Sequence, residues 1–183
     1  KYSIPVVEDA AESIGSYYKG VHTGTFGLLG TLSFNGNKTI TTGGGGMILT
    51  NSAQIAKLAK HLTTQAKVKH PWKFEHDHIG YNYRLPNVNA AIGCAQMEFL
   101  PETIHNKRQL AERYKDFFAG ITEIDFVSEP KNTMSNYWLN AIILKDINER
   151  DKFLEFTNDS KVMTRPAWTL MNKLPMFSDS YTG

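Results

Sequence analysis

The sequence predicts an α/β fold, in which short buried strands alternate with amphipathic helices. Two observations support this class. Apolar runs typical of buried strands occupy residues 4–9, 29–34 and 46–50. Apolar residues at helical spacing follow over residues 52–64 and 85–100, so that strands and helices are mixed along one chain.

The composition excludes several classes of protein. The chain has 183 residues, 41% hydrophobic and 21% charged, which is ordinary for a globular domain. Its net charge of +2 is small and its basic residues are scattered, so nucleic acid is not an expected partner. No apolar run approaches the roughly 18 residues of a membrane span, so we expect no membrane association. The single cysteine, Cys94, cannot form an internal disulfide, which favours a cytoplasmic location, and its apolar helical neighbours predict that it is buried.

The elements of the first unit follow in order. The strand at residues 4–9 ends in acidic residues, and residues 16–22 fit a hairpin within a turn-rich segment. Ser52 is placed to cap the helix of residues 52–64. Residues 65–80 break the apolar periodicity and predict an exposed excursion.

Two helices are expected next, separated at Pro101. The first, residues 85–100, is rich in small residues, which let another helix or a second subunit pack closely. The second is amphipathic and runs to about Phe118, where Gly120 ends it.

A second, smaller unit begins near Ile124. A strand at residues 138–144, a helix at 149–158 and a strand at 162–166 would form an incomplete β-α-β unit. The chain therefore looks like a segment of a longer protein. We expect part of a large domain, a connecting helix and part of a small C-terminal α+β domain, at residues 1–100, 101–120 and 121–183.

Lys38 stands before a run of four glycines in S-F-N-G-N-K-T-I-T-T-G-G-G-G-M-I, residues 33–48. The glycines could cradle a phosphate, or they could let a bulky cofactor approach the backbone. A P-loop needs its lysine after the glycines, and a dinucleotide fingerprint needs a helix directly after them, so neither motif fits. A tight turn or bulge between strands is the plain structural alternative.

Asp9, Ser33 and Lys38 are expected on one rim of the sheet. Asp9 and Ser33 end two predicted strands, and Lys38 follows Ser33 by five residues. Strands of an α/β sheet gather their carboxyl ends at one edge, where ligands bind. Pyridoxal phosphate (PLP) requires this set of groups: an amine for its aldehyde, a carboxylate for its pyridine nitrogen, and short donors for its phosphate.

Three motifs together resemble the DegT/DnrJ/EryC1/StrS family of PLP-dependent sugar aminotransferases. They are V-E-D-A-A-E-S from Val7, G-T-F-G from Gly24 followed by the Lys38 stretch, and G-Y-N-Y-R-L-P-N-V-N-A-A-I-G-C-A-Q-M-E from Gly80. The resemblance covers the chain from its first strand into the second unit. It implies part of a fold type I (aspartate aminotransferase-like) enzyme.

The resemblance implies roles for five residues. Lys38 matches the lysine that forms the Schiff base with PLP and moves the substrate proton, and Asp9 matches the partner of the pyridinium nitrogen. Glu12 stands where relatives carry Gln, His or Glu beside the cofactor ring. Ser33 matches the phosphate-binding serine, and Asn82 the asparagine that reaches the cofactor phosphate of the partner subunit. Each of the last four also has a plain alternative, as a cap, a turn hydroxyl or a solvated acid.

Other residues are assigned less specific roles. The histidines of the excursion lack a fourth ligand at metal-site spacing, so we expect no metal there. These histidines are His70, His76 and His78. The candidates for substrate contact are Arg84, His78, Arg165 and Trp168.

The activity that the resemblance implies is transfer of an amino group from glutamate, through PLP, to the C4 keto group of a nucleotide-linked 4-keto-6-deoxy sugar, by a homodimer with a shared active site. Most relatives carry an acid within the glycine run. The uninterrupted run, with H-P-W-K-F-E-H-D and V-M-T-R-P-A-W, is most similar to the subgroup of the bacillosamine and legionaminic-type pathways. The family's N-terminal phosphate-binding turn and stacking aromatic are not in this chain, so we expect the chain alone to bind PLP weakly and turn over little.

Two alternatives to this activity are open. One is a PLP-dependent sugar dehydratase on the same scaffold, and the other is a non-catalytic relative kept for regulation or assembly. Dehydratases replace the lysine by histidine, so Lys38 argues against the first. The second predicts the loss of Asp9 or Lys38, and both are present.

Overall fold

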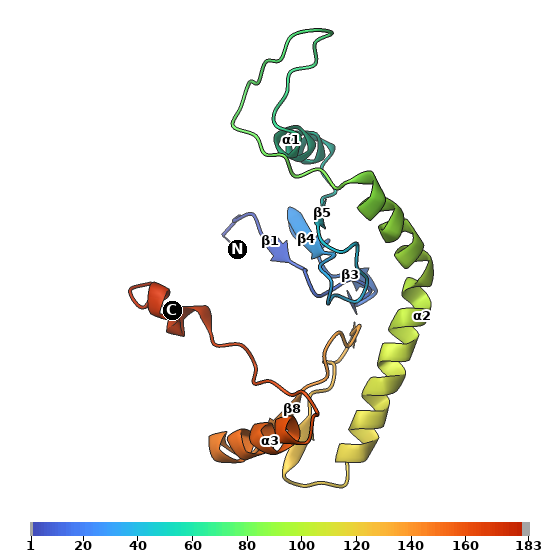
Figure 1. Cartoon of the computed structure of the whole chain (residues 1–183), viewed down its shortest axis with the longest axis vertical. Helices are drawn as coiled ribbons and strands as arrows, with labels where there is room; N and C mark the ends of the chain where they lie inside the picture. The colour runs from blue at the N-terminus through green and yellow to red at the C-terminus, as the bar shows by residue number, and fades with distance from the viewer. Residues whose placement is uncertain (1, 181–183) are drawn as a thin grey trace.

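The computed structural model describes residues 2–180. Strands and helices are mixed along the chain, and Figure 1 shows α2 running down one side of the molecule from the first unit to the second. The elements are β1 (Val7–Asp9), β2 (Tyr17–Tyr18), β3 (Val21–His22), β4 (Leu29–Ser33), β5 (Gly46–Leu49), α1 (Ala53–Thr63), α2 (Asn87–Phe118), β6 (Ile124–Phe126), β7 (Thr133–Met134), β8 (Ile142–Leu144), α3 (Ile147–Asp159), and the 3-10 turns η1 (Met171–Lys173) and η2 (Pro175–Phe177).

A three-stranded sheet with the order β1-β4-β5 forms the centre of the first unit. β1 runs parallel to β4 and places Asp9 opposite Thr31, while β5 runs antiparallel to β4. Asp9 and Ser33 therefore end neighbouring strands at the same edge, as the sequence predicts. The expectation that the first strand is buried is wrong. β1 is an edge strand that pairs only with β4, so Val7 is 61% exposed and Asp9 is exposed as well.

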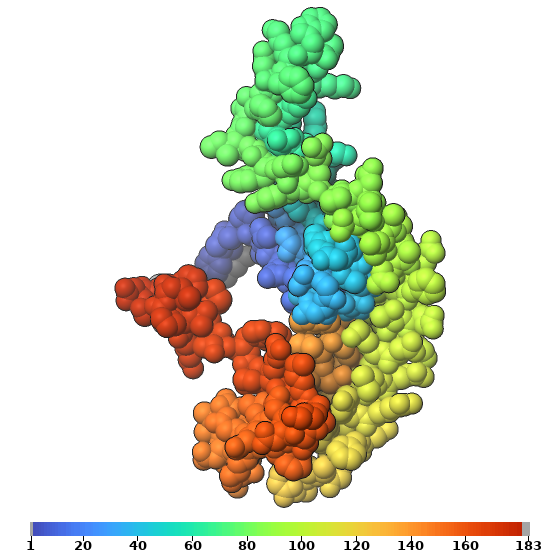
Figure 2. All heavy atoms as spheres, in the orientation of Figure 1, coloured from blue at the N-terminus to red at the C-terminus, as the bar shows by residue number. Residues whose placement is uncertain are grey.

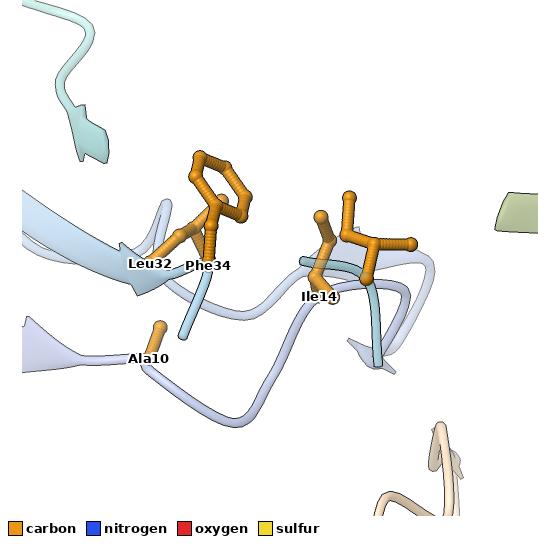
Figure 3. Close-up of a cluster of buried hydrophobic side chains, with 5 residues drawn as sticks. Ala10, Ile14, Leu32 and Phe34 are labelled. Atoms are coloured by element: carbon orange, nitrogen blue, oxygen red, sulfur yellow. The ribbon is translucent and has the colours of Figure 1, made fainter. Parts of the chain in front are cut away.

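A cluster of buried apolar side chains lies where these strands end. Figure 3 shows that it joins β4 to the loop after β1. Each large side chain buried in this way stabilises the fold by roughly 1.5–3 kcal/mol. The cluster thus anchors the loops on both sides of the candidate lysine. Its members are Ala10, Ile14, Leu32, Phe34 and Ile40.

The predicted hairpin at residues 16–22 is confirmed as β2 and β3, which pair antiparallel. β7 joins the other edge of β2, with Met134 opposite Tyr17, so a strand from the second unit completes a sheet of the first. The division of the chain at residue 120 into domains stays a prediction.

The glycine run packs against α2. The side-chain amide of Asn89 donates to the Thr42 carbonyl at 2.5 Å, and the Gln96 side-chain oxygen accepts from the Thr41 amide at 3.4 Å. A Cβ on Gly93 would lie 2.9 Å from the Thr42 methyl group, so the glycine lets the helix approach closely. The run also meets β4, where Gly46 stands opposite Ser33, and its Gly45 lies close to the Leu85 side chain. That it also lies beside a cofactor stays a prediction.

α2 is one continuous helix of 32 residues, so the expected break at Pro101 is wrong. Proline removes one backbone hydrogen bond and costs about 3 kcal/mol inside a helix. Burial of Ile104 and Ala111 in the turns that follow stabilises the continued helix. The helix ends at Phe118 with a right-handed Ala119 as its C-cap, so it needs no glycine in the left-handed conformation there.

The expectation that Cys94 is buried is also wrong, because its side chain is exposed on α2. The helix face that packs on the glycine run carries Asn89, Gly93 and Gln96, which are spaced by four and three residues. Cys94 follows Gly93 directly and is rotated by about 100° from that face.

The helix predicted at residues 52–64 is confirmed as α1, with the Ser52 hydroxyl accepting from the Ile55 amide at 3.3 Å. The excursion at residues 65–80 is exposed as predicted, and Phe74 is 80% exposed. No helix within residues 2–180 combines the length and the apolar character needed to cross a bilayer.

The second unit pairs β6 antiparallel with β8, and α3 follows close to the predicted residues. The expected strand at 162–166 is absent from the described chain, so the predicted β-α-β unit is wrong. The polar groups of this segment bond to α3 instead of a sheet. The Val162 amide donates to the Thr157 carbonyl at 2.8 Å, and the Asn158 side chain donates to the Thr164 carbonyl at 3.1 Å.

The glycines of the run are not equivalent, and substitution will separate them. Gly45 has φ +102°, and a Cβ there would lie 2.7 Å from the Leu85 side chain, whereas a Cβ on Gly44 meets open space. We expect Gly45→Ala to lower the free energy of unfolding by at least about 1–2 kcal/mol, because a non-glycine residue is strained at positive φ. Gly44→Ala is the matched control and is expected to change it little. If denaturant unfolding showed the same loss of free energy for both variants, the two glycines would be equivalent and this prediction would be wrong.

Candidate functional site

Lys38 lies in the loop after β4, and its amine meets groups from two distant parts of the chain. Its Nζ forms an ion pair with the Glu12 carboxylate and lies 4.5 Å from the centre of the Trp138 ring. Only 12% of the Lys38 side chain is exposed. The next two residues, Thr39 and Ile40, are buried, so the backbone that carries the amine is fixed by packing.

Trp138 is fixed in turn by polar contacts and by a second indole. Its ring N–H donates to the Asn37 carbonyl at 2.7 Å, and its own carbonyl accepts from Lys107 at 3.3 Å. The ring of Trp168 stacks on it with centroids 6.3 Å apart and planes 10° from parallel. The structure thus brings one predicted substrate residue, Trp168, to the group around Lys38.

Asn136 ties the segment that carries Trp138 to the first unit. It is 4% exposed, and its side-chain amide donates to the carbonyls of Glu12 at 2.7 Å and Ile14 at 2.9 Å. Its backbone amide donates to the Ser16 hydroxyl at 3.0 Å. A buried amide with these partners fixes the register between two segments more than 100 residues apart in sequence.

An ion pair fastens the same segment to α2. Arg108 donates to both oxygens of Glu129 at 2.8 Å, and Glu129 also accepts from the Ser135 amide at 2.6 Å. The Arg108 guanidinium lowers the pKa of the Glu129 carboxyl below its usual value. Glu129 likewise raises the pKa of Arg108, so both shifts describe one favourable charged pair.

Asp9 and Ser33, at the sheet edge, can each form a further hydrogen bond. One Asp9 oxygen accepts from the Ala11 amide at 3.1 Å, and the Ser33 hydroxyl oxygen accepts from the Asn35 amide at 3.3 Å. Within residues 2–180, no partner engages the other Asp9 oxygen or the Ser33 hydroxyl proton. An amine, a carboxylate oxygen and a hydroxyl donor are the donor set that PLP requires, so these residues fit that cofactor.

The remaining predicted residues lie elsewhere. Asn82 pairs with Thr64 beside α1, and its side-chain oxygen accepts from Arg84 at 3.5 Å. His78 contacts Asp77 at 3.0 Å. Figure 1 shows α1 and the excursion at the end of the molecule opposite α3. In the described part of the chain, neither these residues nor Arg165 contact Lys38. The role of Asn82 toward a partner subunit stays a prediction.

Sequence reasoning did not identify Trp138 and Asn136. The sequence predicts a strand over W-L-N-A-I-I-L, residues 138–144, but only Ile142–Leu144 forms one, as β8. The signal that could have found them is N-Y-W itself, a polar residue and two aromatics just before the short strand. Tyr137 has φ +44°, which is strained for an aromatic residue and is a conformation common at functional sites.

Comparison with known proteins identifies relatives over nearly the whole chain. The model of the DegT/DnrJ/EryC1/StrS aminotransferase family matches residues 1–183. GDP-perosamine synthase from Escherichia coli O157:H7 is 40% identical over 176 residues, which cover 96% of this chain and 48% of that protein. The putative pyridoxal phosphate-dependent aminotransferase EpsN from Bacillus subtilis (strain 168) is 38% identical over 176 residues, covering 96% and 45%.

A solved structure has the same fold. The aminotransferase TlmJ from Streptoalloteichus hindustanus superposes with a TM-score of 0.90 at 27% identity, covering 95% of this chain and 47% of its own. The predicted fold class, an α/β segment of a fold type I aminotransferase, is therefore confirmed. The chain spans about half the length of the curated relatives it matches.

The Arg108–Glu129 pair predicts a pH dependence of stability. Because the pKa of Glu129 is lowered in the folded state, the pair stabilises the fold above the unfolded value of 4.5. That contribution is lost as the pH falls through the folded pKa.

We expect Glu129→Gln to lower the melting temperature at pH 7 by roughly 2–4 °C. The difference from the parent should shrink as the pH drops below 4.5. Glu149→Gln, at an exposed pair with Lys152, is the control. A difference that grows in acid would contradict the assignment.

Proposed function

The chain belongs to the DegT/DnrJ/EryC1/StrS aminotransferase family, and on that basis we propose that the protein containing it transfers amino groups to a nucleotide-linked keto-sugar with PLP as cofactor. The observation that carries the proposal is Lys38. Its amine is largely shielded from water, is fixed by a buried backbone, and lies on the loop that continues from the sheet edge at Ser33.

Each of the chain's groups has a task in this proposal. Bound PLP would supply the electron sink that lets a proton leave the amino-bearing carbon. Lys38 Nζ would hold the cofactor covalently and then take and return that proton, because a positioned amine can serve as base and acid in turn. The free Asp9 oxygen would keep the ring nitrogen protonated, and the Ser33 hydroxyl would donate to the phosphate.

Glu12 and Trp138 set the position of the lysine amine. The Glu12 carboxylate holds the ammonium group by charge, and the Trp138 ring covers it by a cation–π contact. Trp168 stacks on Trp138, so its segment lies next to the ring that covers the amine. This supports Trp168, with Arg165 on the same segment, as a residue of the substrate site.

Glutamate as the amino donor and a homodimer with a shared site are part of the proposal. The separation of Asn82 and Arg84 from Lys38 supports the dimer, because these residues then become available to the site of a second copy. The N-terminal half of α2 also exposes apolar side chains, among them Val88 at 74% and Phe99 at 58%. Water-exposed apolar area of this kind favours association. The lone Cys94 is compatible with a cytoplasmic setting.

The keto-sugar that we propose is a GDP-linked 4-keto-6-deoxy sugar, accepting the amino group at C4. The support is the 40% identity to a protein named for a GDP-linked product. The subgroup suggested by the glycine run stays a prediction. In the structure the run serves packing on α2, and Gly44 faces open space, so nothing local requires glycine at that position.

Covalent trapping tests the assignment of Lys38. The complete protein is incubated with PLP, reduced with borohydride and digested, and the modified peptide is located by mass spectrometry. We expect the label on Lys38, and its loss in Lys38→Arg but not in the control Lys57→Arg, which changes a lysine on α1. A label on another lysine would overturn the assignment, and no label at all would support a non-catalytic relative.

A substrate panel tests the sugar. With glutamate as donor, we expect the complete protein to aminate a GDP-linked 4-keto-6-deoxy sugar with a kcat/KM at least about tenfold above that for the UDP-linked amino-sugar analogues, a difference of about 1.4 kcal/mol. Products are measured by mass spectrometry. The reverse order would favour the bacillosamine-type subgroup, and would leave the Lys38 result unaffected.

A further inference from the structure

Three metal-ligating side chains meet at a place that the proposed aminotransferase chemistry does not use. They come from the last turn of α1 and from the returning limb of the excursion. His61 Nε2 lies 2.6 Å from Asp77 Oδ1, and His78 Nδ1 lies 3.0 Å from the same oxygen. All three ligand atoms lie within 4.8 Å of one another. We propose that His61, Asp77 and His78 form a binding site for a divalent transition metal ion, with Zn²⁺ as the fitting species.

The donor set selects the class of ion. Two imidazole nitrogens and one carboxylate oxygen suit Zn²⁺ and its neighbours, whereas Mg²⁺ and Ca²⁺ prefer oxygen ligands. One oxygen of Asp77 faces both imidazoles and would supply the anionic ligand. Three protein ligands leave a fourth tetrahedral position for water.

The present spacing requires only small movements. Ligands at 2.0–2.1 Å from a tetrahedral ion are about 3.3 Å apart, slightly farther than the hydrogen-bond distances now seen around Asp77. The side chains of Asp77 and His78 are 48% and 59% exposed, so they have room to rotate and the ion has a path from solvent. His61 is 29% exposed and forms the inner wall of the site.

The backbone beneath the ligands is already ordered, and a site on such a scaffold needs little rearrangement. The Ala66 amide donates to the His61 carbonyl at 2.8 Å, and the Asp77 amide donates to the Ala66 carbonyl at 3.3 Å. Ala66 itself is fully buried. Gly80 lets this turn close, because a Cβ there would lie 2.3 Å from the Gln65 carbonyl carbon.

The ion would act as a staple that holds the excursion to α1. The two limbs are otherwise joined by a few backbone contacts, such as the Val68 amide to the Glu75 carbonyl at 2.9 Å. The tip carries exposed aromatic side chains, with Trp72 at 76% exposure. Stapling the base of this excursion would restrict the positions that its tip can sample.

The other histidines of the excursion do not take part. His76 Nδ1 lies 2.7 Å from the Gln65 carbonyl, and His70 Nδ1 accepts from the Lys73 amide at 3.0 Å. The sequence expectation of no metal rested on the spacing of the three excursion histidines. The proposed trio keeps His78 and takes His61 from the helix and Asp77 from the same limb.

Metal uptake by the complete protein tests the site. Protein freed of metal by a chelator is titrated with Zn²⁺ by calorimetry, and with Co²⁺ by its visible absorption, which reports ligand geometry. We expect the parent to bind one more equivalent of Zn²⁺ than His61→Gln or His78→Gln, or to bind it at least about tenfold more tightly. Glutamine keeps the size and hydrogen bonding of each position, and circular dichroism checks that the variants fold. The control His76→Gln should bind as the parent does.

A second readout tests the staple. Zn²⁺ should slow tryptic cleavage after Lys67, Lys69 and Lys73 in the parent and in His76→Gln, but not in His61→Gln. Equal Zn²⁺ uptake by the parent and the His61 and His78 variants would overturn the site. Uptake without any protection of these lysines would overturn its role as a staple.

Discussion

The buried side-chain amide of Asn136 is the contact on which the arrangement around Lys38 depends. It donates hydrogen bonds to the backbone carbonyls of Glu12 and Ile14 in the loop after β1, from a segment more than 100 residues away in sequence. Removing it would leave the buried Ile14 carbonyl without a donor, which costs about 1–3 kcal/mol, and would also release the part-buried Glu12 carbonyl. No apolar side chain could replace it, because apolar contact fixes neither distance nor register so narrowly. The same loop carries Glu12, and the same segment carries Trp138, so one amide sets the position of both groups that meet the lysine amine.

α2 supplies the second constraint, because it contacts both units along its length. Its first half bonds through Asn89 and Gln96 to the two threonines before the glycine run, and its second half holds Glu129 through Arg108. The loop with Lys38 leads into the first of these attachments. The segment held by the second attachment carries Trp138, which contacts the lysine amine. Figure 2 shows a gap, on the side away from α2, between the end of the segment after α3 and the first unit. The backbone around Lys38 is therefore held by two separate parts of α2, which suits an amine that must stay in place.

Local patterns predicted the local parts of this structure. The Ser52 cap, the hairpin at residues 16–22 and the strand ends at Asp9 and Ser33 follow from rules that act over a few residues. Two errors have different causes. Pro101 remains inside a helix that burial of Ile104 and Ala111 stabilises, whereas the segment at 162–166 folds back locally and bonds to the end of α3 instead of a sheet. The trio of Asn136, Trp138 and Lys38 could not be predicted from spacing, because nothing within the sequence of either segment records its distant partner. The roles of the sheet-edge residues came from the family motifs, and the structure adds that their bonding capacity is free.

The Lys38 site depends on long-range contacts and the proposed metal site on local ones, so substitutions elsewhere in the chain affect them differently. Lys38 depends on long-range contacts, so a defect in Asn136 or in the Arg108–Glu129 pair reaches it through the second unit. The His61 cluster depends on a backbone ladder between nearby segments and shares no contact partner with Lys38 in residues 2–180. Energies at positions without shared partners are close to additive. A metal ion at His61 would therefore leave the lysine amine unchanged within one chain. In the proposed dimer, the excursion and Asn82 would lie near the site of the other copy. Coupling between the metal ion and the lysine would then be expected only when two chains assemble.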